Sequence, residues 1–227
     1  IARPLQSYHD HNEQSQAPAL VERMRQGQRL ALISDAGMPL MADPGFRLVQ
    51  ACQEAGVMVT ALPGACAIPT ALALSGLPPA PFCFLGFLPP KSAARRKIWE
   101  PFQGLPATLA AFETAPRLCS SLQDALAVLG DRKGAVAREL TKTYEEVRRG
   151  ALSALHAWYS VHSPRGEIVL MVEGHTEAGD DGTWQTLLHE AMEHLPLAQA
   201  VENVAGATGV SRRRVYQQAL QWRKRHT

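Results

Sequence analysis

The sequence lacks long hydrophobic runs, and it has little net charge. No stretch of about 18 apolar residues occurs, which is the length needed for a membrane-spanning helix, so we expect no association with a membrane. The net charge is only +2, so the total charge indicates no particular class of partner, although its distribution along the chain does. The chain starts at Ile1 without an initiator methionine or a signal peptide, and we expect it to be part of a longer protein.

The sequence also lacks the spaced ligands of a metal site. Its cysteines lie in separate apolar segments, which is typical of reduced core residues in a cytoplasmic protein. They are Cys52, Cys66, Cys83 and Cys119. His9, Asp10 and His11 form a short polar cluster, but no cysteine or third spaced histidine completes it. We therefore predict that the protein binds no metal.

What is present is an ordinary globular composition. The 227 residues are 46% hydrophobic and 19% charged, which is sufficient for one large domain or two modest domains with an appendage. We expect the first domain in residues 1–79, the second in 80–175 and a helical extension in 183–227. A Gly- and Asp-rich stretch, residues 175–182, has the composition of a linker.

Residues 34–45 form the most informative loop. They follow an apolar run, residues 30–34, which we interpret as a buried strand, and they precede a predicted helix over 46–55. Open α/β sheets bind ligands at such strand ends. The loop contains two aspartates, Asp35 and Asp43, which can accept hydrogen bonds from an ammonium group or from ribose hydroxyls. An ordinary turn in which Asp43 caps the helix is the alternative.

A second loop of the same kind follows. Residues 57–62 form another β-branched run, and residues 63–67 lead into a helix of small residues that ends near Ser75. This order predicts parallel strands with both loops at one edge of the sheet. The small residues at the helix start suit a bound carboxylate or phosphate, and close packing of the helix on the sheet is the competing interpretation.

Residues 82–174 predict a second α/β unit with more antiparallel pairing. We expect strands at 82–88, 107–112, 134–140, 144–149 and 166–172, and helices at 118–129 and 151–160. Four cations lie between Lys91 and Lys97 at a predicted helix start, where positive charge is locally unfavourable. This placement favours an anionic partner, although a solvated helix start is the alternative.

The C-terminal segment is helical and basic. We predict helices over 184–194, 197–205 and 212–225, with a turn at 208–210 that has the form of a helix-turn-helix. No Asp or Glu occurs after Asn203, and Tyr216 and Trp222 lie among the cations of the last helix. This pattern indicates nucleic-acid binding, and a small solvated bundle with a basic end is the alternative.

Five motifs together resemble the ribosomal RNA small-subunit methyltransferase I family. They are SDAGMPLMADPG (34–45), LPGACA (62–67), GFLPPK (86–91), ARELTKTYE (137–145) and GEIVL (166–170). The resemblance implies an α/β, two-domain tetrapyrrole-methylase-like fold with a helix-turn-helix-like C-terminal extension. It also implies an S-adenosylmethionine-dependent enzyme that methylates the ribose 2′-OH of a 16S rRNA cytidine.

The resemblance further implies a set of site residues. The cofactor-binding residues would be Asp35, Ala36, Gly37, Pro39, Asp43, Pro63, Gly64, Cys66, Ala67, Glu113, Arg138 and Gly166. The candidates for a general base are His9, Asp10 and Glu139, and positioning without a base is equally open. The candidate RNA contacts are Lys91, Arg95, Arg96, Arg117, Lys142, Arg212, Arg213 and Arg214.

The family begins with a strand, a glycine-containing loop and an acidic segment that this sequence does not show, so we expect a truncated N-terminus. The partners implied are 16S rRNA or the small ribosomal subunit, and a second copy in a homodimer. Tetrapyrrole (precorrin-type) and diphthine-type methyltransferases share the fold and remain alternatives, as does a non-catalytic nucleic-acid-binding protein. The last of these leaves both glycine-containing loops unexplained.

Overall fold

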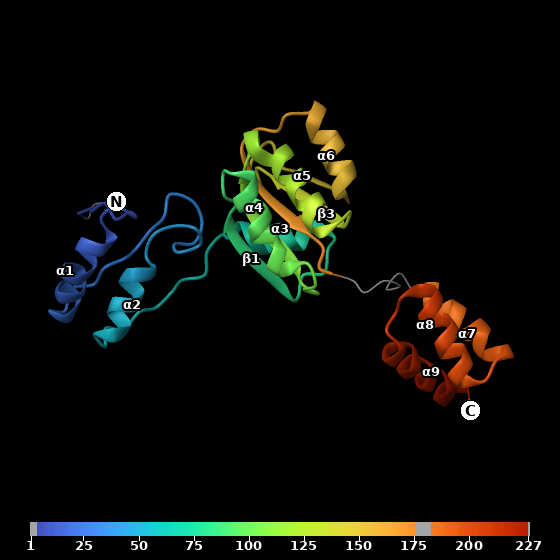
Figure 1. The fold of residues 1–227 in the computed structure, drawn as a ribbon. Helices are drawn as coiled ribbons and strands as arrows, with labels where there is room; N and C mark the ends of the chain where they lie inside the picture. Colours follow the sequence, from blue (N-terminus) through green and yellow to red (C-terminus); the bar gives the residue numbers. More distant parts are fainter. Residues whose placement is uncertain (1–3, 176–182, 227) are drawn as a thin grey trace. The chain divides into compact units, whose positions relative to one another are not determined.

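The computed structural model describes residues 4–175 and 183–226. The chain divides into two compact units, one formed by Ile1–Gln103 with Ala107–Glu173 and the other by Gly104–Pro106 with Gly174–Thr227 (Figure 1). Most of the predicted linker, residues 176–182, lies outside the described residues. Within the described part of the chain, no helix is long and apolar enough to cross a membrane.

The first unit begins with two helices that pack together. They are α1 (Glu13–Arg25) and α2 (Phe46–Glu54), and α2 lies close to the helix predicted over 46–55. Ala17, Leu20 and Cys52 are buried where they meet. At the edge of this contact the Arg47 Nε lies 2.8 Å from the Glu13 Oε1.

Two predicted strands are absent in this region. Residues 28–34 and 57–66 form no strand and pair with none in the described part of the chain. A strand is stabilised by hydrogen bonds to a neighbour. Neither segment has such a neighbour, and several of their apolar side chains are exposed, with Met58 at 91%. The expected parallel pairing of these two segments is therefore wrong for this structure.

The five-stranded sheet lies in the part of the chain after residue 80. Its strands are β1 (Phe82–Phe87), β2 (Thr108–Thr114), β3 (Lys133–Arg138), β4 (Glu146–Ala151) and β5 (Glu167–Val172). The order is β1-β2-β5-β3-β4, with β1 and β2 parallel and the other pairs antiparallel. The predicted strands and their mainly antiparallel pairing are confirmed.

Helices cover both faces of the sheet. The helix α3 (Ala67–Ser75) packs on one face, where Ile68 contacts a layer of small residues that includes Ala135 and Ala137. The neighbouring position, Gly134, points the other way, because a Cβ there would lie 3.0 Å from the Leu152 side chain. That second face carries α5 (Leu118–Leu129) and α6 (Leu152–Val161), and α4 (Ser92–Trp99) packs on α5. Short 3₁₀ helices at Glu100–Phe102 and Ala115–Arg117 complete the unit.

The second unit is a small helical bundle. It contains α7 (Thr183–His194), α8 (Leu197–Thr208) and α9 (Arg212–His226), as predicted. Trp184, Leu188, Val201 and Val215 form its apolar centre. Gly209 has a φ of +70°, which ends α8 and makes the short turn into α9.

Candidate functional site

The two glycine-containing loops lie against each other. A Cβ added to Gly37 would lie 3.2 Å from the carbonyl oxygen of Ala65, and one added to Gly64 would lie 3.5 Å from the Met38 sulfur. Although the strands that were expected to place them are unpaired, residues 34–45 and 63–67 therefore form one joint surface. Glycine is needed at position 37, because its φ is +80° and the opposite backbone is close.

The first loop is held in an unusual conformation. Leu40 and Ala42 have positive φ values of 69° and 67°, which side-chain-bearing residues rarely adopt. The Ser34 hydroxyl donates to the Asp43 carboxylate at 2.6 Å and also lies 3.1 Å from the carbonyl of Ala36. Asp43 therefore fastens the loop and does not cap α2, whose first flanking residue is Gly45. Asp35 is exposed.

The second loop leads into the N-terminus of α3. Cys66 is the residue before the helix, and its carbonyl accepts from the Thr70 hydroxyl at 2.9 Å. The first turn of α3 contains no acidic side chain. Because the first N–H groups of a helix have no intrahelical acceptor, this end is suited to a carboxylate.

Glu113, which is buried on β2, forms an ion pair with the partly exposed Arg117 in the turn after the strand. Glu113 is 2% exposed, and its Oε1 lies 2.7 Å from the Arg117 Nη2. Its other oxygen accepts from the hydroxyl of Ser121 on α5. Arg117 was predicted to contact RNA, yet its guanidinium is engaged with Glu113 and with the Thr114 hydroxyl.

Glu139 lies at the end of β3 and is tied to the start of β5. Its Oε1 accepts from the backbone N–H of Glu167 at 2.9 Å and from the Lys142 ammonium at 3.1 Å. Both hydrogen bonds lower the pKa of the Glu139 carboxyl below its ordinary value, and the bond from the Glu167 N–H has the larger effect. A side chain at Gly166, where φ is +85°, would overlap this carboxylate. Gly166 therefore makes room for Glu139.

Glu113 and Arg138 project from the sheet face that carries α5 and α6. Arg138 pairs with Glu146 of β4 across a distance of 3.5 Å. The loop formed by residues 63–67 instead precedes α3, on the opposite face. The structure thus brings the two loops together, but it does not place the side chains of Glu113 and Arg138 on the same face as α3.

His9 and Asp10 lie in the turn before α1. The His9 N–H donates to the Asn12 side-chain oxygen at 2.8 Å, and the His9 and His11 rings lie 5.9 Å apart. No group of three or more metal-ligating side chains is found in the described parts of the chain.

One of the predicted RNA contacts is wrong. Arg95 is 3% exposed, and its Nε lies 2.9 Å from the Asp124 Oδ2, while another of its nitrogens donates to the carbonyl of Pro90 at 2.8 Å. It joins α4 to α5 and cannot reach a phosphate in this conformation. Arg96 shares Asp124 with it but keeps about half of its side chain exposed, at 49%. Lys91, at the start of α4, is exposed.

Sequence analysis missed two residues that bind site candidates. Asp124 pairs with Arg95, and Ser121 donates a hydrogen bond to Glu113. Both residues lie on the buried stripe of α5, where their polar character among leucines was the available signal. A buried carboxylate requires a cationic partner. Asp124 could therefore have been matched with the cation cluster at 91–97.

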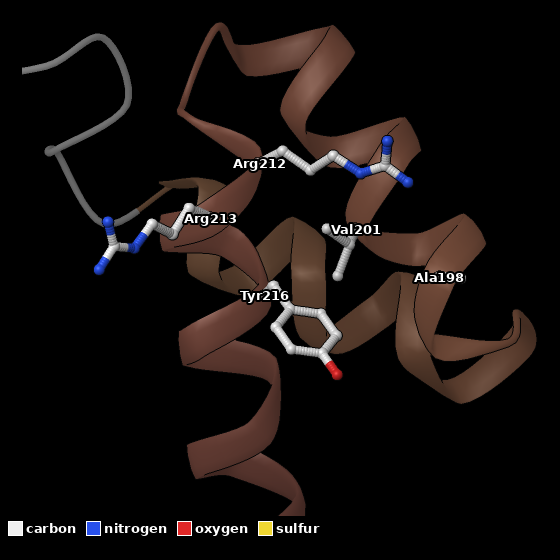
Figure 2. A pocket seen from close by; sticks show the side chains of 5 residues that line it. All are labelled: Ala198, Val201, Arg212, Arg213 and Tyr216. Carbon is white, nitrogen blue, oxygen red and sulfur yellow. The ribbon is translucent and has the colours of Figure 1, made fainter.

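The second unit presents a groove between α8 and α9. Its volume is about 330 Å³, and it is lined by Ala198, Val201, Arg212, Arg213 and Tyr216. Figure 2 shows the Arg212 and Arg213 side chains extending from the start of α9, with the Tyr216 ring on the same helix. Arg212 lies 3.6 Å from Glu202, and both side chains are largely exposed. The groove therefore combines an apolar floor with cations at its rim.

Comparison with known proteins defines the class. A model of the family described as Tetrapyrrole (Corrin/Porphyrin) Methylases matches residues 2–156. Two solved structures share the fold. A crystal structure of the methyltransferase CobJ has a TM-score of 0.54 at 19% identity and covers 76% of this chain and 74% of that one. A crystal structure of diphthine synthase has a TM-score of 0.55 at 16% identity and covers 74% and 68%. The protein is a methylase of this fold.

Sequence relatives identify the branch. Proteins named Ribosomal RNA small subunit methyltransferase I are 44% identical over 222 residues in Escherichia coli O157:H7 and 41% identical over 230 residues in Pseudomonas aeruginosa. These alignments cover 96% and 97% of this chain and 78% and 81% of the relatives. A model described as the RsmI C-terminal HTH domain matches residues 178–223. The chain belongs to the ribosomal RNA small subunit methyltransferase I family, and it is an S-adenosylmethionine-dependent methyltransferase.

The loop surface fits this cofactor chemically. S-adenosylmethionine carries a carboxylate, an ammonium group and a ribose diol. The open start of α3 provides N–H donors for a carboxylate, and the exposed Asp35 provides an acceptor for an ammonium group or a diol. The lack of a side chain at Gly37 leaves backbone accessible beside Ala65. These features agree with the cofactor role predicted for the loops, which remains a prediction for each residue.

Proposed function

We propose that the protein transfers a methyl group from S-adenosylmethionine to the ribose 2′-OH of a cytidine in 16S rRNA. The observation that carries the proposal is that one chain combines the methylase fold with a cationic helix-turn-helix unit. A methylase of small tetrapyrroles does not need the second element. The relatives named as small-subunit rRNA methyltransferases support the same substrate class.

The cofactor-binding residues in this proposal lie mainly on the two loops. Asp35, Ala36, Gly37, Pro39 and Asp43 act from the first loop. Pro63, Gly64, Cys66 and Ala67 act from the second loop. Glu113, Arg138 and Gly166 are the predicted contacts from the sheet region, where Glu113 and Gly166 also have the packing roles described above.

The chain's contribution to the reaction is positioning. Bound S-adenosylmethionine supplies an electrophilic methyl group. The protein must hold the ribose hydroxyl in line with that group and exclude water, and such positioning can supply about 7–11 kcal/mol of the barrier. His9, Asp10 and Glu139 remain the candidates for accepting the hydroxyl proton. The hydrogen bonds to Glu139 lower the pKa of its carboxyl, which makes it a weaker base than an ordinary glutamate.

The RNA contacts in this proposal come from both units. Lys91 and Arg96 present exposed cations on α4, and Arg212, Arg213 and Arg214 begin α9. Arg117 and Lys142 can contribute only while keeping their carboxylate partners. We further propose that the substrate is the small ribosomal subunit or its 16S rRNA, that the enzyme acts in the cytoplasm and that it works as a homodimer.

Methyl transfer to isolated 30S subunits tests the proposal. Labelled S-adenosylmethionine, the protein and unmethylated subunits are incubated together, and the rRNA is then digested to nucleosides. The expected product is 2′-O-methylcytidine, whose neighbouring phosphodiester resists alkali because the 2′-OH is blocked. Label on a base, or labelling of a tetrapyrrole in place of rRNA, would contradict the proposal. Naked 16S rRNA as a second substrate shows whether the assembled subunit is required.

A further inference from the structure

A cavity lies between β4 and the end of α6, and of its lining residues only Arg138 belongs to the site proposed so far. Its volume is about 270 Å³. It is lined by Arg138, Glu146, Arg148, Trp158, Tyr159, His162, Ser163 and Pro164. The cavity lies at the edge of the sheet, because β4 is the last strand in the order.

The cavity contains an excess of hydrogen-bond donors. The Glu146 carboxylate forms an ion pair with each arginine. Its oxygens lie 3.5 Å from the Arg138 Nη2 and 3.0 Å from the Arg148 Nη2. Within the described residues, the Nε atoms of both arginines are buried and have no hydrogen-bond partner. The two guanidinium groups carry two positive charges and Glu146 carries one negative charge, so one positive charge remains. The two buried Nε–H donors still require a hydrogen-bond acceptor.

Tyr159 adds a neutral donor. Tyr159 is 5% exposed, and its buried hydroxyl lies near the Arg148 guanidinium without forming a well-aligned hydrogen bond to any of the described residues. Burial, and then the nearby Glu146 carboxylate, raise the pKa of this hydroxyl, while Arg148 and Arg138 lower it by less. The hydroxyl therefore keeps its proton at neutral pH and can donate it to an anion.

The remaining wall is a stack of planar groups. The guanidinium carbon of Arg148 lies 3.7 Å from the Trp158 ring, and the His162 ring is stacked on Trp158 at 3.7 Å with a 6° angle between the planes. The His162 Nδ1 lies 3.0 Å from the carbonyl oxygen of Trp158, which fixes the ring. This packing holds the Arg148 guanidinium in place, so little side-chain entropy is lost when a ligand binds it.

We propose that this cavity binds a backbone phosphate of the RNA substrate, through Arg138, Arg148 and Tyr159. Phosphate oxygens match the planar fork of arginine, and the cavity holds one net positive charge to receive them. The carbonyl groups at the C-terminus of α6 repel an anion. Their effect is that of about half a negative charge, which is smaller than the one net positive charge of the cavity. The inference rests on the proposed RNA substrate and adds a second anchoring point to it, on the sheet rather than on α9.

Arginine side-chain NMR tests the binding directly. The Nε–H signals of Arg138 and Arg148 are followed while inorganic phosphate, and separately a short single-stranded RNA, is added to the full chain. Saturable shifts with both probes are expected. Shifts with phosphate but none with RNA would overturn RNA as the source of the phosphate and leave a site for a free phosphate ester. No shift with either probe would overturn the site altogether.

Two variants with matched controls measure the contribution to RNA affinity. Loss of a charged hydrogen bond in Arg148→Gln should weaken RNA binding by about tenfold or more, and Tyr159→Phe by about threefold to tenfold. The controls Arg25→Gln and Tyr144→Phe change exposed residues of the same types and should leave affinity unchanged. Equal RNA affinity in Arg148→Gln and Arg25→Gln would overturn the proposal.

S-adenosylmethionine binding by the same variants separates this inference from the proposed function. All four variants should bind the cofactor as the unaltered chain does, because none changes the two loops. If RNA is bound and the affinities fall as expected, but no methyl is transferred to rRNA, the cavity assignment holds and the proposed function fails.

Discussion

At the scale of single residues, Gly166 shows how one absent side chain positions a functional candidate. Its φ of +85° and the Glu139 carboxylate beside it leave no room for a Cβ. Gly166→Ala should therefore destabilise the fold by about 1–3 kcal/mol, through backbone strain and displacement of Glu139. Urea denaturation at neutral pH measures this change in the free energy of unfolding.

The matched control is Gly150→Ala. Gly150 lies within β4 at an ordinary φ, and a Cβ there would meet only the Ala154 side chain at 3.8 Å. Stability should stay within about 0.5 kcal/mol of the unaltered protein. An equal loss of stability in both variants would contradict the specific role of Gly166, because it would show that a side chain is equally harmful at either glycine.

Asp124 gives the protein an acid-sensitive element. Burial alone would raise the pKa of its carboxyl, but hydrogen bonds from Ser92, Arg96 and Arg95 together outweigh burial and lower the pKa. A lowered pKa in the folded state means stability that is present above the unfolded pKa, about 4, and is lost as the pH falls through the folded value. Unfolding free energies measured from pH 7 down to pH 3 should therefore decline in this range.

Asp124→Asn should remove part of that pH dependence. It should also cost about 3–5 kcal/mol at neutral pH, because it leaves the buried Arg95 guanidinium without a countercharge. Asp131→Asn is a surface comparison, since the Asp131 carboxylate bonds to exposed Ser153. If Asp124→Asn were as mild as Asp131→Asn, the role of Asp124 as the anchor of α4 would be refuted.

The same pair shows what the sequence could and could not provide at this scale. The sequence shows the cation cluster at 91–97, but it does not show which of the four side chains is buried and which are exposed. Arg95 differs from the others by being buried against Asp124 of α5, which lies 29 residues further along the chain, and the sequence does not show that the two residues are neighbours. The Arg148–Trp158–His162 stack was missed for the same reason, since strand and helix meet only in the fold.

At the scale of elements, periodicity located the helices and the five strands of the sheet to within a few residues. The exceptions are residues 30–34 and 57–62, which have the composition of strands but pair with nothing in the described chain. Side-chain pattern reports which residues prefer a β conformation, whereas a strand also requires a partner for its backbone groups. The contact between the loops at Gly37 and Ala65 followed from the motif order and is seen without those strands.

The helical unit depends on a small apolar core, which gives a prediction at the same scale. Leu188 is 0% exposed, whereas its neighbour Leu187 is 44% exposed. Leu188→Ala should cost about 2–5 kcal/mol, a large share of the stability of so small a bundle, while Leu187→Ala should be nearly neutral. Amide hydrogen exchange should show faster exchange in α7–α9 only for Leu188→Ala.

Loss of the bundle should reduce RNA affinity and leave cofactor affinity unchanged. Calorimetry with S-adenosylmethionine on Leu188→Ala checks the second part. A matching loss of cofactor binding would mean that the loops depend on the bundle, contrary to the division of the chain into two units.

At the scale of the whole molecule, the chain joins a methylase unit to a basic helical unit, and we propose that both contribute to one reaction. The family assignment rests on nearly the whole chain, since relatives above 40% identity align with 96% and 97% of it. We propose that the two loops of the first unit bind the cofactor, and that RNA is bound by α4 and the sheet edge in the first unit and by α9 in the second. This division predicts that the two binding functions can be damaged separately.

The central claim is that the loops at residues 34–45 and 63–67 bind S-adenosylmethionine. Calorimetric titration of the chain with S-adenosylmethionine tests it, alongside Gly37→Val and the helix control Gly206→Ala. Saturable binding at one site per chain is expected for the unaltered protein and for Gly206→Ala. Gly37→Val should bind at least about tenfold more weakly, because its side chain would strain a positive φ and press on Ala65. A folded Gly37→Val protein that binds as tightly as the unaltered chain, or a folded unaltered chain that binds none, would contradict the claim.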